Sequence, residues 1–124
     1  MDCVFCKIID GSIPSYTIYE DDIVKCFLDI NPDTNGHTLI IPKKHFKDID
    51  DMDNETLSHI FNVAKDIKKL LEEKLNIDGL TFIQNNGDVQ EVKHYHLHLK
   101  PYYNKKRELK KVEEIYKILN SEAN

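Results

Sequence analysis

The sequence has no long apolar run, and no stretch of it approaches the roughly 20 apolar residues of a membrane span. Its first residues, MDCVFCKIIDGS, lack both the basic start and the apolar segment of a signal peptide. We therefore expect a soluble cytoplasmic protein with no membrane partner. The three cysteines are an odd number, which fits a reducing compartment better than a disulfide scaffold.

The sequence also lacks an excess of positive charge. Its 22 acidic residues outnumber its 17 lysines and arginines, and the formal net charge is -5. A general nucleic-acid binder would be basic, so no nucleic-acid partner is expected. This charge still allows a small phosphorylated ligand held by local dipoles. With 124 residues and no internal repeat, the chain is expected to form one domain over residues 1–124.

Turn residues and alternating apolar residues predict five short strands. The expected strands cover residues 16–20, 23–30, 37–42, 80–84 and 94–99. The first two form a hairpin around Asp21 and Asp22, and Pro101 ends the last one.

Apolar residues at helical spacing predict a long helix from Asn54 to Leu75, with Asp53 as its N-cap. A short amphipathic helix is expected near the C-terminus, around residues 112–119. Together the elements predict an α+β fold, a five-stranded antiparallel sheet with one long helix and a C-terminal helix.

Three histidines alternate with apolar residues in HYHLHL, from His94 to Leu99. On a strand they would share one face. A solvated polar face explains three alternating histidines poorly, and two other interpretations stay open. An HxH pair can give two ligands to one zinc. Alternatively, a neutral imidazole can attack phosphorus once a hydrogen bond at its other nitrogen fixes the tautomer.

A CxxC motif, Cys3 and Cys6, stands near the N-terminus. A thioredoxin-type redox pair follows a strand and opens a helix, and here there is no room for a preceding strand. A zinc half-site would need two more ligands, which the six histidines could supply. Two cysteines without a metal are the third alternative.

Polar side chains accompany the histidines in the sequence. Asn85, Asn86 and Gln90 lie beside a glycine turn and could hold phosphate oxygens, although such residues also simply make turns. Asp29 follows an apolar strand. It could accept hydrogen bonds from two sugar hydroxyls, as carboxylates do in nucleotide sites, or it could start a turn before Pro32.

Taken together, these segments resemble the histidine triad (HIT) family, in its nucleotide-binding Hint-type branch. HYHLHL resembles the family signature of alternating histidines, although Lys100 follows where a second apolar residue is usual. The segments CVFCKIIDGSIPS, YEDDIVKCFLDINP, GHTLIIPKKHF and DGLTFIQNNG also look like family segments, in the family's order. The resemblance covers residues 3–101, implies the HIT-like form of the α+β fold, and leaves residues 102–124 as a C-terminal helical extension.

The resemblance implies a nucleotide hydrolase or transferase that acts at the α-phosphate of purine nucleoside phosphoramidates or related nucleotides. His96 would be the nucleophile that forms a nucleotidyl-histidine, and His98 would contact the phosphate. Asp29 matches the acid that binds the ribose hydroxyls, and His37 matches a histidine next to the site. Asn85 and Gln90 match residues near the phosphate, and the base pocket matches Val4, Phe5, Ile8, Phe27 and Ile30.

The resemblance further implies a structural zinc ion and a homodimer. The zinc ligands would be Cys3, Cys6, His45 and His94. A closed Cys2His2 shell suits a structural role better than a catalytic one. An anchored His94 would also stiffen the segment that presents His96. The family dimer pairs through the long helix and a sheet edge.

The chain departs from the family pattern between Asn86 and Glu91. The loop looks two residues shorter, and Val89 stands where the family has glycine. Glu91 stands where well-known members have a serine that contacts the leaving group. A carboxylate there could repel an anionic leaving group or protonate an amine.

Three alternatives to a phosphoramidase stay open. They are a dinucleoside polyphosphate hydrolase of the same family, a nucleotide-binding regulator with incidental activity, and a metal-dependent hydrolase with an open zinc. The CxxC motif argues against the open zinc.

Overall fold

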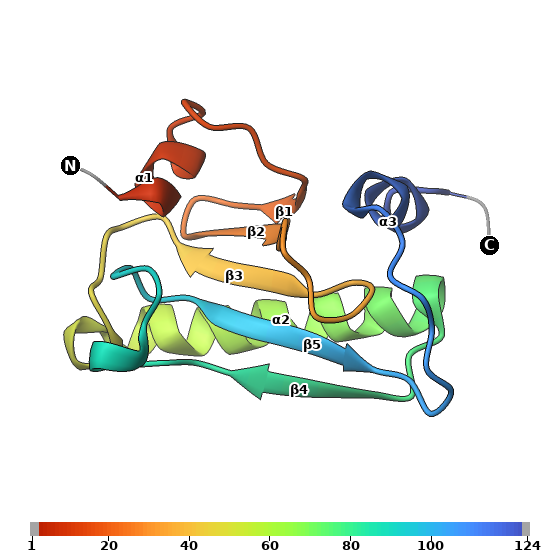
Figure 1. Ribbon diagram of the computed structural model, residues 1–124. Coiled ribbons are helices and arrows are strands. Elements are labelled where there is room, and N and C mark those ends of the chain that lie inside the picture. The colour runs from red at the N-terminus through yellow and green to blue at the C-terminus, as the bar shows by residue number, and fades with distance from the viewer. Residues whose placement is uncertain (1–2, 123–124) are drawn as a thin grey trace.

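Five strands form one antiparallel sheet in the computed structural model, which describes residues 3–122 (Figure 1). The order of the strands across the sheet is β1-β2-β3-β5-β4. Their bounds are β1 Thr17–Glu20, β2 Val24–Leu28, β3 Thr38–Pro42, β4 Gly79–Ile83 and β5 Leu97–Tyr102. The expected α+β fold is confirmed, as is the hairpin between β1 and β2.

Three helices accompany the sheet, namely α1 (Val4–Ile9), α2 (Asn54–Leu75) and α3 (Val112–Leu119). The bounds of α2 agree with the prediction. Its N-cap is Asp53, whose carboxylate accepts a hydrogen bond from Thr56 N at 3.0 Å. The C-terminal helix is also confirmed. Within residues 3–122, no helix combines the length and apolar character needed to cross a membrane.

The sequence patterns did not predict helix α1. Its N-cap is Cys3, whose Sγ accepts a hydrogen bond from Cys6 N at 3.3 Å. Cysteine is not among the usual N-cap residues, so the ordinary start signal is missing from the sequence. Two 3-10 turns, Ile49–Asp51 and Gly87–Val89, complete the described structure.

The two faces of the sheet bury different cores. Helix α2 packs its apolar side, including Ile60, Ala64 and Leu71, against the sheet face that carries Leu97 and Leu99. On the opposite face, α1 forms a smaller core with β2 and β3. Its buried members are Cys3, Phe5, Ile8, Phe27, Leu39 and Ile41. Since His98 lies between Leu97 and Leu99 on a strand, its side chain shares the face that α1 covers.

The expected strand at 94–99 is corrected to 97–102, so His94 and His96 precede β5. The reason is that the residues before Leu97 hydrogen-bond to the last residue of β3 and to the loop after it, and not to a neighbouring strand in the regular β-sheet pattern. Tyr95 N donates to the carbonyl of Phe46 at 2.7 Å, and His94 Nε2 lies 2.9 Å from the carbonyl of Pro42. Pro101 lies inside β5, opposite Leu80 of β4. It needs no partner on the β3 side, because pairing with β3 ends at Leu99.

Gly36 and Gly11 offer a matched test of the packing beneath the segment that leads into β3. Both have positive φ, +91° at Gly36 and +87° at Gly11. A Cβ on Gly11 would have no atom within 4 Å, whereas a Cβ on Gly36 would lie 2.7 Å from Leu75 Cδ1 and 3.3 Å from Pro101 Cγ.

We expect Gly11→Ala to lower the free energy of unfolding by about 1–3 kcal/mol through backbone strain alone. Gly36→Ala should cost roughly 1–3 kcal/mol more, because the methyl group also overpacks the core. Urea denaturation of both variants measures the difference. Equal losses would contradict the crowding at Gly36.

Candidate functional site

His96 and His98 line one cavity of about 160 Å³ beside β5. The other residues around it are Asp29, Asn31, Asp33, His37, Ile83, Asn85, Glu91 and Lys100. They come from the end of β2, the loop before β3, the end of β4, the segment before β5 and β5 itself. Four residues singled out in the sequence for nucleotide chemistry, Asp29, Asn85, His96 and His98, therefore meet in one place.

The register of the sheet sets the two sides of this cavity. Phe27 of β2 is opposite Leu39 of β3, Leu39 is opposite His98, and His98 is opposite Ile83 of β4. Residues paired in this way point to the same face, and adjacent strands are about 4.8 Å apart. The apolar side chains of Phe5 and Phe27 therefore lie on one side of the histidines, and Ile83 lies on the other.

A backbone hydrogen bond fixes the tautomer of His96. Its Nδ1 lies 2.8 Å from the carbonyl oxygen of His94, which can only accept, so Nδ1 carries the proton. The unprotonated Nε2 of a neutral ring then keeps its lone pair. The ring packs edge-on to Phe5, with 5.0 Å between the centroids, and the residue is only 4% exposed.

A second chain of hydrogen bonds fixes the tautomer of His98. Asp33 N donates to His37 Nδ1 at 3.1 Å, so a neutral His37 carries its proton on Nε2. That Nε2–H faces His98 Nδ1 at 2.9 Å and donates to it. His98 therefore holds its own proton on Nε2. The ring centroids of His96 and His98 are 4.9 Å apart, so a ring with an N–H at Nε2 neighbours a ring with a lone pair at Nε2.

The rings of His37 and His98 are both neutral at pH 7. Burial lowers the pKa of His98 to about 4, and neighbouring His96 and His37 act in the same direction. Burial also lowers the pKa of His37, although the nearby carboxylate of Asp29 opposes this. Asp29 Oδ2 lies 3.6 Å from His37 Nε2, and its Oδ1 accepts a hydrogen bond from Asn31 N at 2.8 Å.

Asp29, His37 and His98 have ligand atoms within 4.8 Å of one another, which raises the question of a metal site. The hydrogen bond from Asp33 N argues against it. A metal on His37 Nε2 would require the proton on Nδ1, and Nδ1 already accepts from a backbone N–H. The cavity is therefore better suited to hydrogen bonding than to coordination.

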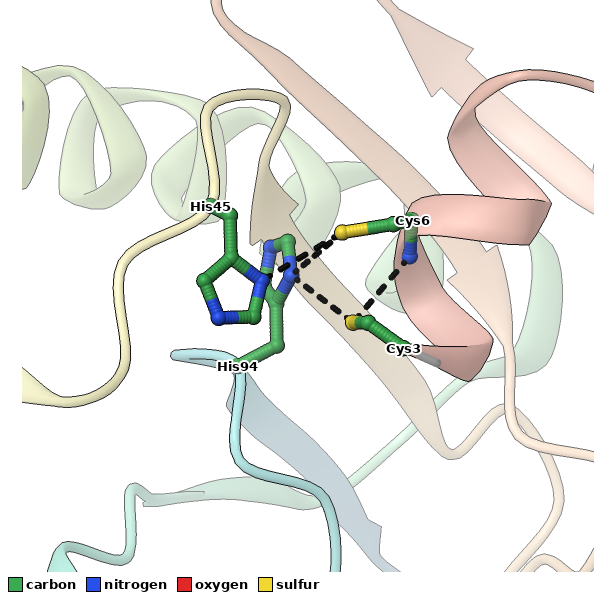
Figure 2. A group of neighbouring side chains, drawn as sticks. All are labelled: Cys3, Cys6, His45 and His94. Atoms are coloured by element: carbon green, nitrogen blue, oxygen red, sulfur yellow. Dashed lines mark hydrogen bonds between the residues drawn. The ribbon is translucent and has the colours of Figure 1, made fainter. Parts of the chain in front are cut away.

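The four residues implied as zinc ligands form a second cluster, shown in Figure 2. His94 Nδ1 lies 3.4 Å from Cys3 Sγ and 3.6 Å from Cys6 Sγ, and His45 Nδ1 lies 3.3 Å from Cys6 Sγ. Around tetrahedral zinc, with Zn–S of about 2.3 Å and Zn–N of about 2.0–2.1 Å, nitrogen and sulfur ligands are about 3.5 Å apart. The cluster fits a tetrahedral zinc ion.

The protonation chemistry of this cluster also suits a cation. His94 Nε2–H donates to the carbonyl of Pro42, so Nδ1 presents a lone pair to the two sulfur atoms. Burial lowers the pKa of His94 to about 4, which keeps the ring neutral. Burial raises the pKa of Cys6 to about 11, and the Cys3 side chain adds to this effect. A metal ion would offset the cost of holding thiolates in this place.

Several other residues that were expected to bind the substrate do not line the cavity. Gln90 is absent from the cavity lining: its side chain accepts from Gly87 N at 3.2 Å and donates to the carbonyl of Lys47 at 2.7 Å. Phe5, Ile8 and Phe27 are buried against one another, so only their outer edges can meet a ligand. Val4 and Ile30 are exposed, with Ile30 71% exposed.

Sequence reasoning missed the parts of the cavity that come from non-adjacent loops. Asp33 and Lys100 form an ion pair at 2.7 Å on its rim, and Lys100 lowers the pKa of the Asp33 carboxyl. Ile83 joins the cavity through its pairing with His98. Only the expected order of the strands could have indicated that pairing.

Comparison with known proteins agrees with this geometry. A family model described as the HIT domain matches residues 10–105. The chain belongs to the HIT family. Helix α3 lies beyond the matched segment.

Two relatives illustrate the range of this HIT family. The chain is 45% identical to an uncharacterised HIT-like protein of Methanocaldococcus jannaschii, over 94% of this chain and 91% of that protein. It is 42% identical to the adenosine 5'-monophosphoramidase of Saccharomyces cerevisiae, over 80% of this chain and 61% of that enzyme.

Among solved structures, a zinc-bound histidine triad family protein of Mycobacterium smegmatis superimposes with a TM-score of 0.88. It is 39% identical, and the match covers 96% of this chain and 91% of that one.

Proposed function

We propose that this HIT-family chain is a nucleotide hydrolase or transferase that acts at the α-phosphate of purine nucleoside phosphoramidates or related nucleotides. One observation carries the proposal: the His94 carbonyl holds the proton of His96 on Nδ1, which leaves a lone pair on Nε2 in a ring next to His98. The similarity to an adenosine 5'-monophosphoramidase supports the substrate class.

In the first step, the lone pair of His96 Nε2 forms a bond to the α-phosphorus, and the bond from phosphorus to the leaving amine breaks. The amine leaves with a proton taken from solvent, while the Nε2–H of His98 donates a hydrogen bond to a phosphate oxygen. The ring of His96 becomes cationic, and its Nδ1–H points at the His94 carbonyl, which stabilises that charge.

In the second step, a water molecule attacks phosphorus and the bond to His96 Nε2 breaks. The water proton passes to solvent, which restores the neutral His96 and releases the nucleoside monophosphate. The hydrogen bond from His37 keeps the Nε2–H of His98 available to the phosphate in both steps.

The nucleoside would lie on the β2 side of the histidines. Asp29 would accept hydrogen bonds from the ribose hydroxyls, and the edges of Phe5 and Phe27 would support the base. Ile8 and Ile30 complete this proposed apolar surface, and Asn85 would hold a phosphate oxygen from the β4 side.

Two alternatives make different predictions. A dinucleoside polyphosphate hydrolase of the same family would prefer a polyphosphate bridge to an amine. A nucleotide-binding regulator would bind nucleotide tightly with negligible turnover. Product analysis with both substrate types separates all three.

Replacing His96 with Ala should abolish turnover of adenosine 5'-phosphoramidate, because no other neutral nitrogen takes its place. Intact-mass analysis of a rapidly quenched wild-type reaction should find a nucleotidyl group on His96. A mass increment on another residue, or turnover by His96→Ala, would contradict the assignment.

We further propose that Cys3, Cys6, His45 and His94 hold a structural zinc ion, as the fitting distances support. When bound, zinc would supply a rigid link between α1, the loop after β3 and the segment before β5. It would take no part in the transfer, because the four ligands fill its tetrahedral shell.

His94 and His96 look alike in the sequence and should behave oppositely. His94→Ala should lose zinc and melt at a lower temperature, because a structural site contributes to folding. His96→Ala should keep the fold and one zinc per chain. Metal analysis and calorimetry test both variants, and the reverse pattern would show the roles to be exchanged.

We also propose a homodimer in the cytoplasm, formed through α2 and the edge strand β4. Phe61 of α2 and Phe82 of β4 are 41% and 43% exposed, and their ring centroids are 5.9 Å apart. Strand β4 lies at one edge of the sheet, where unpaired backbone groups can add another chain.

Phe82→Glu should convert the dimer into a monomer in light scattering, because it charges the proposed apolar contact. Ile23→Glu is the matched control: Ile23 is 43% exposed too, but it lies in the turn between β1 and β2. A monomeric wild-type chain at micromolar concentration would refute the dimer.

A further inference from the structure

Glu91 is the acidic residue of the cavity that has no partner. The carboxylate of Asp33 is paired with Lys100 at 2.7 Å, and Asp29 accepts from Asn31 N. Within residues 3–122, no hydrogen bond or ion pair engages the side chain of Glu91. The lysine nearest to it in sequence, Lys93, donates instead to the carbonyl of Gly87 at 2.5 Å.

The charges around the cavity leave a negative balance. Three carboxylates, of Asp29, Asp33 and Glu91, face one ammonium group, that of Lys100. His37 and His98 do not compensate, because burial lowers the pKa of each and keeps the rings neutral. A substrate that adds several negative charges would meet repulsion here.

The sheet order separates a β2 side of the cavity from a β4 side, and Glu91 belongs to the segment that leads from β4 to β5. Asp29 and Phe27 belong to β2 or directly follow it, two strands from β5. Ile83 ends β4, on the other side of β5, and Asn85 and Glu91 join it around the cavity. If the nucleoside covers the β2 side, the group leaving the phosphorus lies toward Ile83 and Glu91.

We infer that Glu91 determines leaving-group specificity, and that the chain selects nucleoside phosphoramidates whose amine carries a second, cationic group on an alkyl chain. The alkyl chain of the substrate would pack on Ile83, and its cationic group would pair with the Glu91 carboxylate. This inference rests on the proposed function, and it deepens it by naming the leaving group.

The charge of Glu91 also bears on the alternative substrate. A dinucleoside polyphosphate would bring further phosphate charges to the side of the cavity that holds an unpaired carboxylate. The same residue that attracts a cationic amine would therefore disfavour a polyphosphate leaving group.

Three matched substrates test the inference: adenosine 5'-phosphoramidates of 1,4-diaminobutane, butylamine and 4-aminobutyrate. Their leaving groups have similar length and are cationic, neutral and anionic. Wild-type kcat/KM should fall in that order, with roughly fivefold between neighbours for a partly exposed charge pair. Raising the salt concentration should compress the differences.

Glu91→Gln should remove most of the preference while keeping turnover of the butylamine substrate. Asp88→Asn is the control, since Asp88 is an exposed acid of the same loop that is absent from the cavity lining. It should keep the wild-type order. Binding of the three compounds to His96→Ala, measured by calorimetry, should show the same preference without turnover.

The outcomes separate the inference from the proposed function. Equal kcat/KM for the three substrates in the wild type, or an unchanged order in Glu91→Gln, would overturn the role of Glu91 and leave the hydrolase intact. Loss of all turnover in Glu91→Gln would also overturn it, because charge selection alone does not abolish the reaction. A wild-type chain that neither binds nor turns over any of the three would overturn the proposed function itself.

Discussion

Two hydrogen bonds connect the segment before β5 to the last residue of β3 and to the loop after it, and they hold the histidines in their arrangement. The carbonyl of Pro42 accepts from His94 Nε2, and the carbonyl of Phe46 accepts from Tyr95 N. They keep this segment out of the sheet ladder and turn His94 toward the two cysteines. The carbonyl of His94 is then free to accept the proton of His96, from which the chemistry of the cavity follows.

Three neighbouring imidazoles thereby acquire different properties from different acceptors. His94 presents Nδ1 to sulfur, His96 presents a bare Nε2 to the cavity, and His98 presents an N–H because His37 donates to its other nitrogen. Helix α1 connects the metal cluster to the cavity, since Phe5 packs edge-on against both His94 and His96. A change in the metal cluster would therefore reach the proposed nucleophile through direct contacts.

Electrostatics complement this geometry. Burial keeps the rings of His37 and His98 neutral, and among the described residues the Glu91 carboxylate at the cavity has no partner; we infer that it acts on the group that leaves phosphorus. In the proposed complex, Asp29 would bind the ribose and Glu91 would meet the leaving group. In physical terms, the nucleophile depends on hydrogen bonds that salt hardly affects, and the leaving-group preference depends on a charge that salt screens.

Local signals in the sequence determined the regular elements. Apolar spacing and the Asp53 cap were enough to predict α2 from Asn54 to Leu75, and the turn at Asp21 was enough for the first hairpin. The alternation of HYHLHL was enough to identify the histidines as a unit, and the motif order was enough for the family.

Only the tertiary structure decided the start of β5 at Leu97, the inward turn of Gln90 and the meeting of His37 with His98. Each depends on a partner between 43 and 61 residues away in the chain, such as Lys47 for Gln90 and His37 for His98. The periodicity of a sequence indicates on which face of a helix or strand a side chain lies. It carries no information about which distant carbonyl oxygen or nitrogen will accept a hydrogen bond from that side chain.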